Sequence, residues 1–293
     1  MTYSNLIIDA FLILRDAFFD AAMQPIPFAL RDKRNTQDDP LDEHIAHLLQ
    51  ERLTNAICQV SPGPLINPDL VIYRPELCQG QPRNLLMDDV TRIVGIEVKK
   101  LERSLGGRIA RASGMDYNTT PPCGNILVYA ADGAELKIRG FYLFVAQETM
   151  PDRRVVLTAL ALCDGNILNE DFDLYLSIVG QRQKTVGLGS YGDGVNRNRP
   201  MLIFANPLGA QELDRTATVV VPEAQDDRVR LVYRITRRTA VGAARDFCAY
   251  RKSTDVPVDW EIRTLHEPFP QPSARVSETQ ARGRFRVPFV VEP

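Results

Sequence analysis

The run Ile93-Val-Gly-Ile-Glu-Val-Lys-Lys100 constrains this chain more than any other stretch, because it is a buried-type β-strand that carries charge. Successive side chains of a strand point to opposite faces, so Ile96 and Val98 lie on one face. Glu97 and Lys99 emerge together on the other. A carboxylate and an ammonium at this spacing indicate either an ion pair at the end of a strand or a catalytic site.

The composition is that of a globular protein with enough length for a sizeable core: 293 residues, 44% hydrophobic and 25% charged. We expect a single domain over 1–293, with an N-terminal helical elaboration (1–40) and a C-terminal extension (210–293) that is rich in β-structure and arginine. The formal net charge of −2 does not favour a polyanionic partner, so any nucleic-acid surface must be local.

Apolar periodicity predicts a sequence of helices and strands. Helices are expected over 4–23, 42–60 and 169–182. Strands are expected over 69–73, 93–100, 126–129, 141–147, 155–162 and 201–204, with a long glycine-rich loop over 187–200. This order predicts a mixed α/β (α+β) architecture with a central sheet.

Several classes of protein are disfavoured. Five cysteines without a CxxC pair and only three histidines make a Cys/His zinc site poorly supported. The same cysteine usage favours a reduced, intracellular protein. Acidic and basic residues interrupt the apolar stretch 6–23, which excludes a signal-peptide core or a membrane span there. We therefore expect a cytoplasmic protein that does not enter a membrane.

One constellation of charged residues points to chemistry. Pro68-Asp69 opens one apparent strand, and Glu97-Val98-Lys99 lies in the next. If these strands are neighbours, Asp69 and Glu97 converge at one end of the sheet with Lys99 alongside. Two carboxylates suit Mg²⁺, which would stabilise charge on a phosphate, and Lys99 would orient or help to deprotonate a water. Phosphodiester hydrolysis is the reaction these groups would serve; the alternative is a surface ion pair.

Pro68-Asp69 followed by Glu97-x-Lys99 resembles the PD-(D/E)xK motif of the restriction-endonuclease-like nucleases, and a helix before the motif fits their core. The segments GMDYNTTPPCG (114–124) and YGDGVNRNRPMLIFANP (191–207) are similar to stretches of bacterial type II restriction endonucleases. The resemblance spans roughly residues 40–207. The long connection over 74–92 departs from the family pattern.

The resemblance implies a restriction-endonuclease-like core, in which helices flank a central mixed β-sheet. It implies that Asp69 and Glu97 bind Mg²⁺, that the Val98 carbonyl completes the shell, and that Lys99 positions the attacking water. It also implies a homodimer whose symmetry mirrors a palindromic site in double-stranded DNA.

Candidate DNA contacts lie in three places. Basic residues follow the motif, and two loops carry polar and basic side chains that suit phosphates or base edges. The candidates are Lys100, Arg103, Arg111, Asp116, Asn118, Thr119, Asp193, Asn196, Arg197 and Arg199. Both loops also have a structural interpretation. The segment 114–124 would then be a turn capped by Asp and Asn, and the segment 187–200 would be a flexible connector. Arginines at a period of two over 228–238 and 282–286 form either a basic surface or a solvated sheet face.

The leading hypothesis is therefore a Mg²⁺-dependent type II restriction endonuclease of the bacterial cytoplasm. A separately encoded DNA methyltransferase would protect the host DNA. One alternative is a repair or structure-specific nuclease of the same fold. Another is a catalytically silent DNA-binding module, in which Glu97 and Lys99 form a structural pair.

Overall fold

The structure is a computed structural model that describes residues 3–35, 38–63, 66–103, 109–112, 124–170, 216–238, 244–256, 263–265 and 285–292. Its labelled helices are α1 (Leu6–Phe18), α2 (Pro40–Arg52), α3 (Pro75–Cys78) and α4 (Arg83–Met87). Among the described residues, no helix has the length and apolar character needed to cross a membrane.

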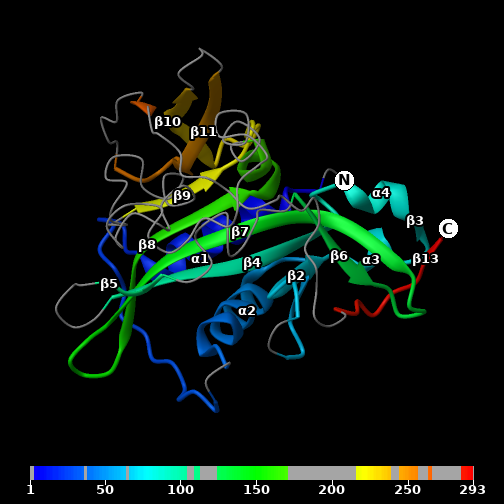
Figure 1. Cartoon of the computed structure of the whole chain (residues 1–293), viewed down its shortest axis with the longest axis horizontal. Coiled ribbons are helices and arrows are strands. Elements are labelled where there is room, and N and C mark those ends of the chain that lie inside the picture. Colours follow the sequence, from blue (N-terminus) through cyan, green and yellow to red (C-terminus); the bar gives the residue numbers. More distant parts are fainter. Residues whose placement is uncertain are drawn as a thin grey trace, which may run out of the picture.

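The strands are β1 (Ile57–Val60), β2 (Leu70–Tyr73), β3 (Gln81–Pro82), β4 (Ile93–Arg103), β5 (Ile109–Ala112), β6 (Asn125–Tyr129), β7 (Glu135–Thr149), β8 (Val155–Asp164), β9 (Thr216–Val220), β10 (Val229–Arg238), β11 (Ala244–Lys252), β12 (Arg263–Leu265) and β13 (Val291–Glu292). Eleven of them form one sheet in the order β1-β2-β4-β7-β8-β9-β11-β10-β12, with β5 beside β4 and β6 beside β7. The sheet is mixed, since β4 is parallel to β7 whereas β2 is antiparallel to β4. The expected α+β class with a central mixed sheet flanked by helices is confirmed (Figure 1).

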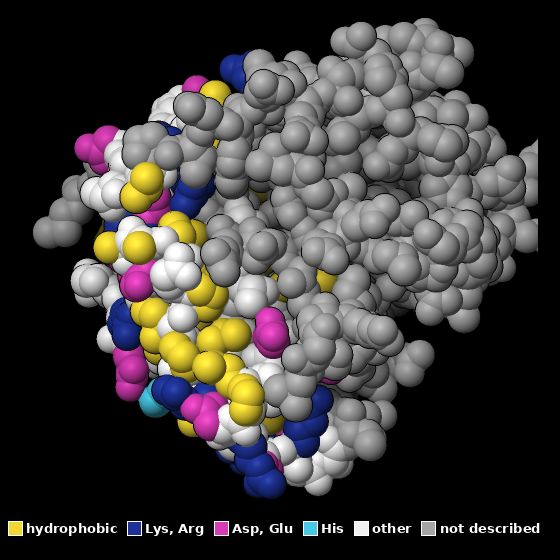
Figure 2. All heavy atoms as spheres, turned by 90° about the vertical axis from the view of Figure 1, so that its left-hand side faces the viewer, with side chains coloured by type: hydrophobic (Ala, Val, Ile, Leu, Met, Phe, Trp, Pro, Cys, Tyr) yellow, Lys and Arg dark blue, Asp and Glu magenta, His cyan; other side chains and the backbone are white. Residues whose placement is uncertain are grey.

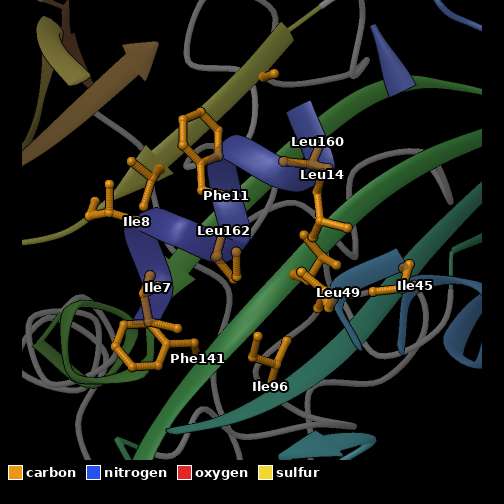
Figure 3. Packing of buried hydrophobic residues seen from close by; sticks show 14 of the residues in the cluster. Ile7, Ile8, Phe11, Leu14, Ile45, Leu49, Ile96, Phe141, Leu160 and Leu162 are labelled. Atoms are coloured by element: carbon orange, nitrogen blue, oxygen red, sulfur yellow. The ribbon is translucent and has the colours of Figure 1, made fainter. Parts of the chain in front are cut away.

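Helices α1 and α2 cover one face of the sheet. The α1 helix begins where the side chain of Asn5 accepts the main-chain N–H of Ile7 at 2.9 Å, a normal N-cap. Apolar side chains of both helices interdigitate with those of β4, β7 and β8 (Figure 3). The labelled members are Ile7, Ile8, Phe11, Leu14, Ile45, Leu49, Ile96, Phe141, Leu160 and Leu162. Their burial fixes α1 and α2 over the centre of the sheet.

A second apolar cluster lies on the opposite face of β2 and β6. The C-terminal segment supplies Phe285, Val287, Phe289 and Val291, which are all buried there. The chain consequently ends beside β3, with β13 parallel to it (Figure 1). The described parts of 210–293 thus lie in two places, because β9 to β12 extend the central sheet while 285–292 packs on its other end.

The helix expected over 42–60 is wrong at its C-terminal part. The α2 helix ends at Arg52, and Ile57–Val60 is instead strand β1, paired antiparallel with β2. Asn55 adopts a φ of 55°, a left-handed conformation that asparagine tolerates and that ends the helical path. The β-branched residues Ile57 and Val60 then favour a strand once β2 is beside them.

The N-terminal helix is also shorter than the expected 4–23. After Phe18 the chain is extended at Phe19, which pairs with Pro25. One carboxylate oxygen of Asp20 accepts the N–H groups of Ala22 and Gln24, each at 2.8 Å, and so stabilises a turn instead of a further helical turn. Residues 165–170 are helical, but the rest of the expected helix 169–182, the loop 187–200 and the strand 201–204 lie outside the described residues.

Candidate active site

The two strands of the motif are neighbours in the sheet. The β2 and β4 strands pair antiparallel, with Leu70 opposite Ile96 as the last pair of the ladder. The next residue in each direction is Asp69 on one strand and Glu97 on the other. The connection over 74–92 does not separate them, because it forms α3, β3 and α4 and returns the chain to the side of β2. The condition that the sequence left open, that these two strands are neighbours, is met.

Beyond this ladder, the residues of β4 from Glu97 to Lys100 pair with β7 on one side. On the other side β2 has ended, and the described part of β5 pairs with β4 from Leu101 onward. Just beyond the end of the β2–β4 ladder, the main-chain N–H of Val98 donates to Oδ2 of Asp69 at 2.7 Å. This hydrogen bond holds the carboxylate at the start of β2.

Glu97 and Lys99 lie on the same face of β4, as the alternation predicts. Lys99 Nζ is 2.7 Å from Oε1 of Glu97, and their side chains are only 11% and 12% exposed. Burial lowers the pKa of Lys99, but the charges of Glu97 and Asp69 outweigh it and raise the pKa above the ordinary value. Lys99 is therefore a cation at neutral pH, suited to holding a water or a phosphate oxygen rather than to accepting a proton.

Asp69 has a strongly perturbed carboxyl group. Burial raises its pKa well above the ordinary value, and the negative charges of Glu97 and Asp42 raise it further. Lys99 and the hydrogen bond from Val98 act in the opposite direction but are weaker. Such a carboxylate ionises readily only when positive charge is brought to it. A perturbed carboxyl group of this kind is typical of functional sites.

Asp42 is a third carboxylate of the site that sequence reasoning missed. It lies in the first turn of α2, and burial together with the charge of Asp39 raises its pKa to about 7. Its Oδ1 atom is buried and has no hydrogen-bond partner among the described residues. An acid in the first turn of a helix is common because it suits the helix dipole, so the sequence offered no signal that Asp42 reaches the motif.

The donor set fits a divalent cation in its chemistry. Asp42, Asp69 and Glu97 repel one another, and a cation would relieve that repulsion. In the described ranges, no three His, Cys, Asp or Glu side chains are arranged as a ready ligand set. Mg²⁺ usually takes one or two carboxylates and keeps several waters, so Asp69 and Glu97 suffice as protein ligands.

The structure places few of the predicted DNA contacts. Lys100 points away from Lys99, and its Nζ forms an ion pair with Asp39. Arg103 ends β4, and Arg111 lies opposite Glu102 in β5. The side chains of Arg103 and Arg111 are outside the described part. So are the residues Asp116, Asn118, Thr119, Asp193, Asn196, Arg197 and Arg199.

Two arginines of the run over 228–238 already form contacts within the protein, whereas Arg234 is exposed. Arg228 contacts Asp226 at 2.6 Å and Asp9 at 2.8 Å. Arg230 donates to the main-chain oxygens of Asp255 and Val256, at 3.2 and 3.3 Å. The expected alternation is also interrupted, because a bulge after Leu231 shifts the register of β10 and leaves that side chain 43% exposed.

In the other run, Arg286 is exposed between the buried Phe285 and Val287, as alternation predicts. Arg282 and Arg284 lie outside the described residues. On the side of the molecule shown in Figure 2, basic and acidic side chains of the described residues are interspersed around a band of hydrophobic ones. The described part of that side carries mixed charge rather than a uniform positive field.

Comparison of the chain with protein-family models, with curated proteins and with solved structures gave no match.

Proposed function

We propose that this protein is a Mg²⁺-dependent nuclease that hydrolyses phosphodiester bonds in double-stranded DNA. One observation carries the proposal: Asp69 and Glu97 are the residues just beyond the last pair of the antiparallel β2–β4 ladder, with Lys99 on the face of Glu97. Two acids and a lysine at the end of this ladder are the groups that metal-assisted hydrolysis of a phosphodiester needs.

In this proposal each residue has its own task. Asp69 and Glu97 would hold the cation, and the N–H of Val98 fixes the orientation of Asp69. The bound Mg²⁺ would polarise the scissile phosphate and lower the pKa of a water. Lys99, a cation beside Glu97, orients the attacking water or a phosphate oxygen. Asp42 adds negative charge that strengthens the attraction for the cation.

The finer assignment is a type II restriction endonuclease that cleaves at a short specific sequence. It rests on the resemblance of 114–124 and 191–207 to segments of such enzymes. With this assignment we also propose a homodimer that binds a palindromic site. The enzyme would act in the bacterial cytoplasm, and a separately encoded methyltransferase would protect the host DNA.

The test is incubation of the purified protein with plasmid DNA, with and without Mg²⁺. Discrete fragments that require Mg²⁺ support the restriction enzyme. Nicking or smearing supports a repair or structure-specific nuclease of the same fold. Asp69→Ala, Glu97→Ala and Lys99→Ala should each abolish cleavage, and full activity in any of them would overturn the site assignment.

A second candidate is a catalytically silent DNA-binding module. The contact of 2.7 Å between Lys99 and Glu97 favours it, because a mostly buried ion pair also serves a purely structural role. DNA that stays intact at every Mg²⁺ concentration, but still shifts on a gel, would support this module and contradict the nuclease.

A further inference from the structure

Two consecutive lysines of β4 serve opposite faces of the sheet. Lys99 contacts Glu97, whereas Lys100 reaches the other face and contacts the carboxylate of Asp39, with Glu102 3.8 Å away. Each lysine side chain is only 11% exposed. Lys100 is thus enclosed between β4 and the start of α2, and a contact of its ammonium with a DNA phosphate would require this pair to open.

Asp39 is the residue that begins α2. Its side chain accepts the N–H of Leu41 at 3.2 Å, and its main-chain oxygen accepts the N–H of Asp42, also at 3.2 Å. The partner of Lys100 is therefore the same residue that fixes the first turn of the helix. Any shift of Asp39 relative to β4 moves Asp42 with it.

Asp42 interacts with the charged residues of the site, so the position of the first turn of α2 affects that site. Its charge raises the pKa of Asp69 and of Lys99, so these groups lie close enough to interact electrostatically. Its Oδ1 atom is buried without a hydrogen-bond partner among the described residues. The packing of α2 against β1 and α1 fixes the helix as a body, but the Lys100–Asp39 contact ties its N-terminus directly to the strand that carries Glu97.

We propose that Lys100 is a positioning residue: through its ion pair with Asp39 it holds the first turn of α2, and with it the carboxylate of Asp42, against the Asp69–Glu97 site. This inference rests on the proposed function, because it assigns Lys100 to the cation site rather than to the DNA. Groups that orient the residues around a metal commonly matter almost as much as the ligands themselves.

The test compares variants that break the pair from either side. Lys100→Met keeps the length of the side chain and removes its charge. Asp39→Asn also breaks the ion pair, yet asparagine remains a good N-cap for α2. Lys100→Arg restores a cation. The matched control is Lys252→Met, which breaks an ion pair of 2.7 Å between β11 and Asp16 of α1, away from the site.

The first measurement is binding of Mn²⁺ to each protein without DNA, followed by the resonance signal of free Mn²⁺. Lys100→Met and Asp39→Asn should weaken binding by a similar factor, roughly 10- to 100-fold, and their combination should be little worse than either alone. Lys100→Arg should recover most of the affinity, and Lys252→Met should bind as the wild type does. Unchanged binding in both Lys100→Met and Asp39→Asn would overturn the inference.

The second measurement is DNA affinity in EDTA as a function of salt. A lysine that contacts a phosphate lowers the salt slope by about one when it is removed, whereas a positioning lysine does not. We expect unchanged slopes for Lys100→Met and Asp39→Asn. A lower slope in Lys100→Met alone would assign Lys100 to the DNA and contradict the inference.

Hydrogen exchange separates failure of this inference from failure of the proposed function. The amide of Asp42 should exchange faster in Lys100→Met and in Asp39→Asn than in the wild type. If the wild type neither binds Mn²⁺ nor cleaves DNA, the nuclease proposal fails and this inference with it. If the wild type does both and the variants keep metal binding and slow exchange, only the inference fails.

Discussion

The main-chain N–H of Val98 donates a hydrogen bond to Oδ2 of Asp69 over 2.7 Å, just beyond the last pair of the β2–β4 ladder. The bond fixes a perturbed carboxylate beside Glu97. It also satisfies an N–H group that would otherwise need another partner.

This bond leads to a prediction on Asp69. Asp69→Asn keeps an oxygen that accepts the N–H of Val98 and removes the repelling charge, so its stability at pH 8 should equal or exceed that of the wild type. The rate of its Mg²⁺-dependent cleavage should fall by more than the roughly 10- to 100-fold that is typical when a group that only orients a metal ligand is removed. Asp69→Ala should be less stable than Asp69→Asn by about 1–2 kcal/mol, because the N–H loses its acceptor. Urea unfolding and plasmid cleavage measure both effects. An active Asp69→Asn would contradict the role in metal binding.

A second prediction concerns Gly95, which packs against Pro68, the residue that precedes Asp69. A Cβ atom added at Gly95 would lie 3.1 Å from Cγ of Pro68 and 3.3 Å from the side chains of Ile126 and Ile138. Gly95→Ala should therefore destabilise the fold by about 1–3 kcal/mol and displace Pro68. Because Asp69 follows Pro68, cleavage should fall even under conditions where the variant is fully folded.

The control for Gly95→Ala is Gly63→Ala. Among the described residues, a Cβ added at Gly63 would meet only the Cδ1 atom of Ile66, at 3.9 Å, which is ordinary contact. Thermal unfolding and cleavage should match the wild type there. Equal effects of the two substitutions would mean that the close packing at Pro68 is not the cause.

A third prediction follows from the pKa of Asp42, which burial and Asp39 raise to about 7. The folded state holds this proton more tightly than the unfolded state, so the contribution of Asp42 to stability is fully present below its ordinary pKa. It is lost as the pH rises toward 7 and above. In EDTA, Asp42→Asn should be more stable than the wild type at pH 8, by up to about 4 kcal/mol. The two proteins should converge near pH 4.

Adding Mg²⁺ supplies the check on this prediction. A cation that binds the folded site stabilises it, by about 1.4 kcal/mol when its concentration is ten times the dissociation constant. Mg²⁺ should therefore raise the stability of the wild type at pH 8 and have a smaller effect on Asp42→Asn. The same effect in both proteins would show that Asp42 does not contribute to the site.

A fourth prediction tests a buried ion pair that stabilises the fold away from the candidate site. Asp255 lies 2.5 Å from Arg15 of α1, with side chains only 1% and 5% exposed. Asp255→Ala would leave Arg15 buried without this carboxylate, and should cost about 3–5 kcal/mol in urea unfolding. Asp152→Ala removes an exposed partner of Arg154 and serves as the control, with unchanged stability expected. A small effect at Asp255 would mean that solvent reaches Arg15.

The sequence alone determined the strand at the centre of the protein and the residues that it presents. Alternation in Ile93–Lys100 predicted that Glu97 and Lys99 share a face, because the period of a strand is a local property of the backbone. Apolar runs likewise predicted β2, β6, β7 and β8, although β7 extends further than expected. The mixed α+β class followed from the order of these elements.

Only the tertiary structure decided what surrounds that strand. The end of α2 and the start of β1 depend on β2 lying beside them, which local propensity does not encode. The charge of Asp42 acts on Asp69, and Lys100 contacts Asp39, because α2 packs beside β4 and not because of any spacing in the sequence. Contacts between residues distant in the chain depend on burial and pairing across the whole sheet. The sequence pattern therefore predicted the residues that β4 presents, whereas the residues that α2 brings to them follow only from the fold.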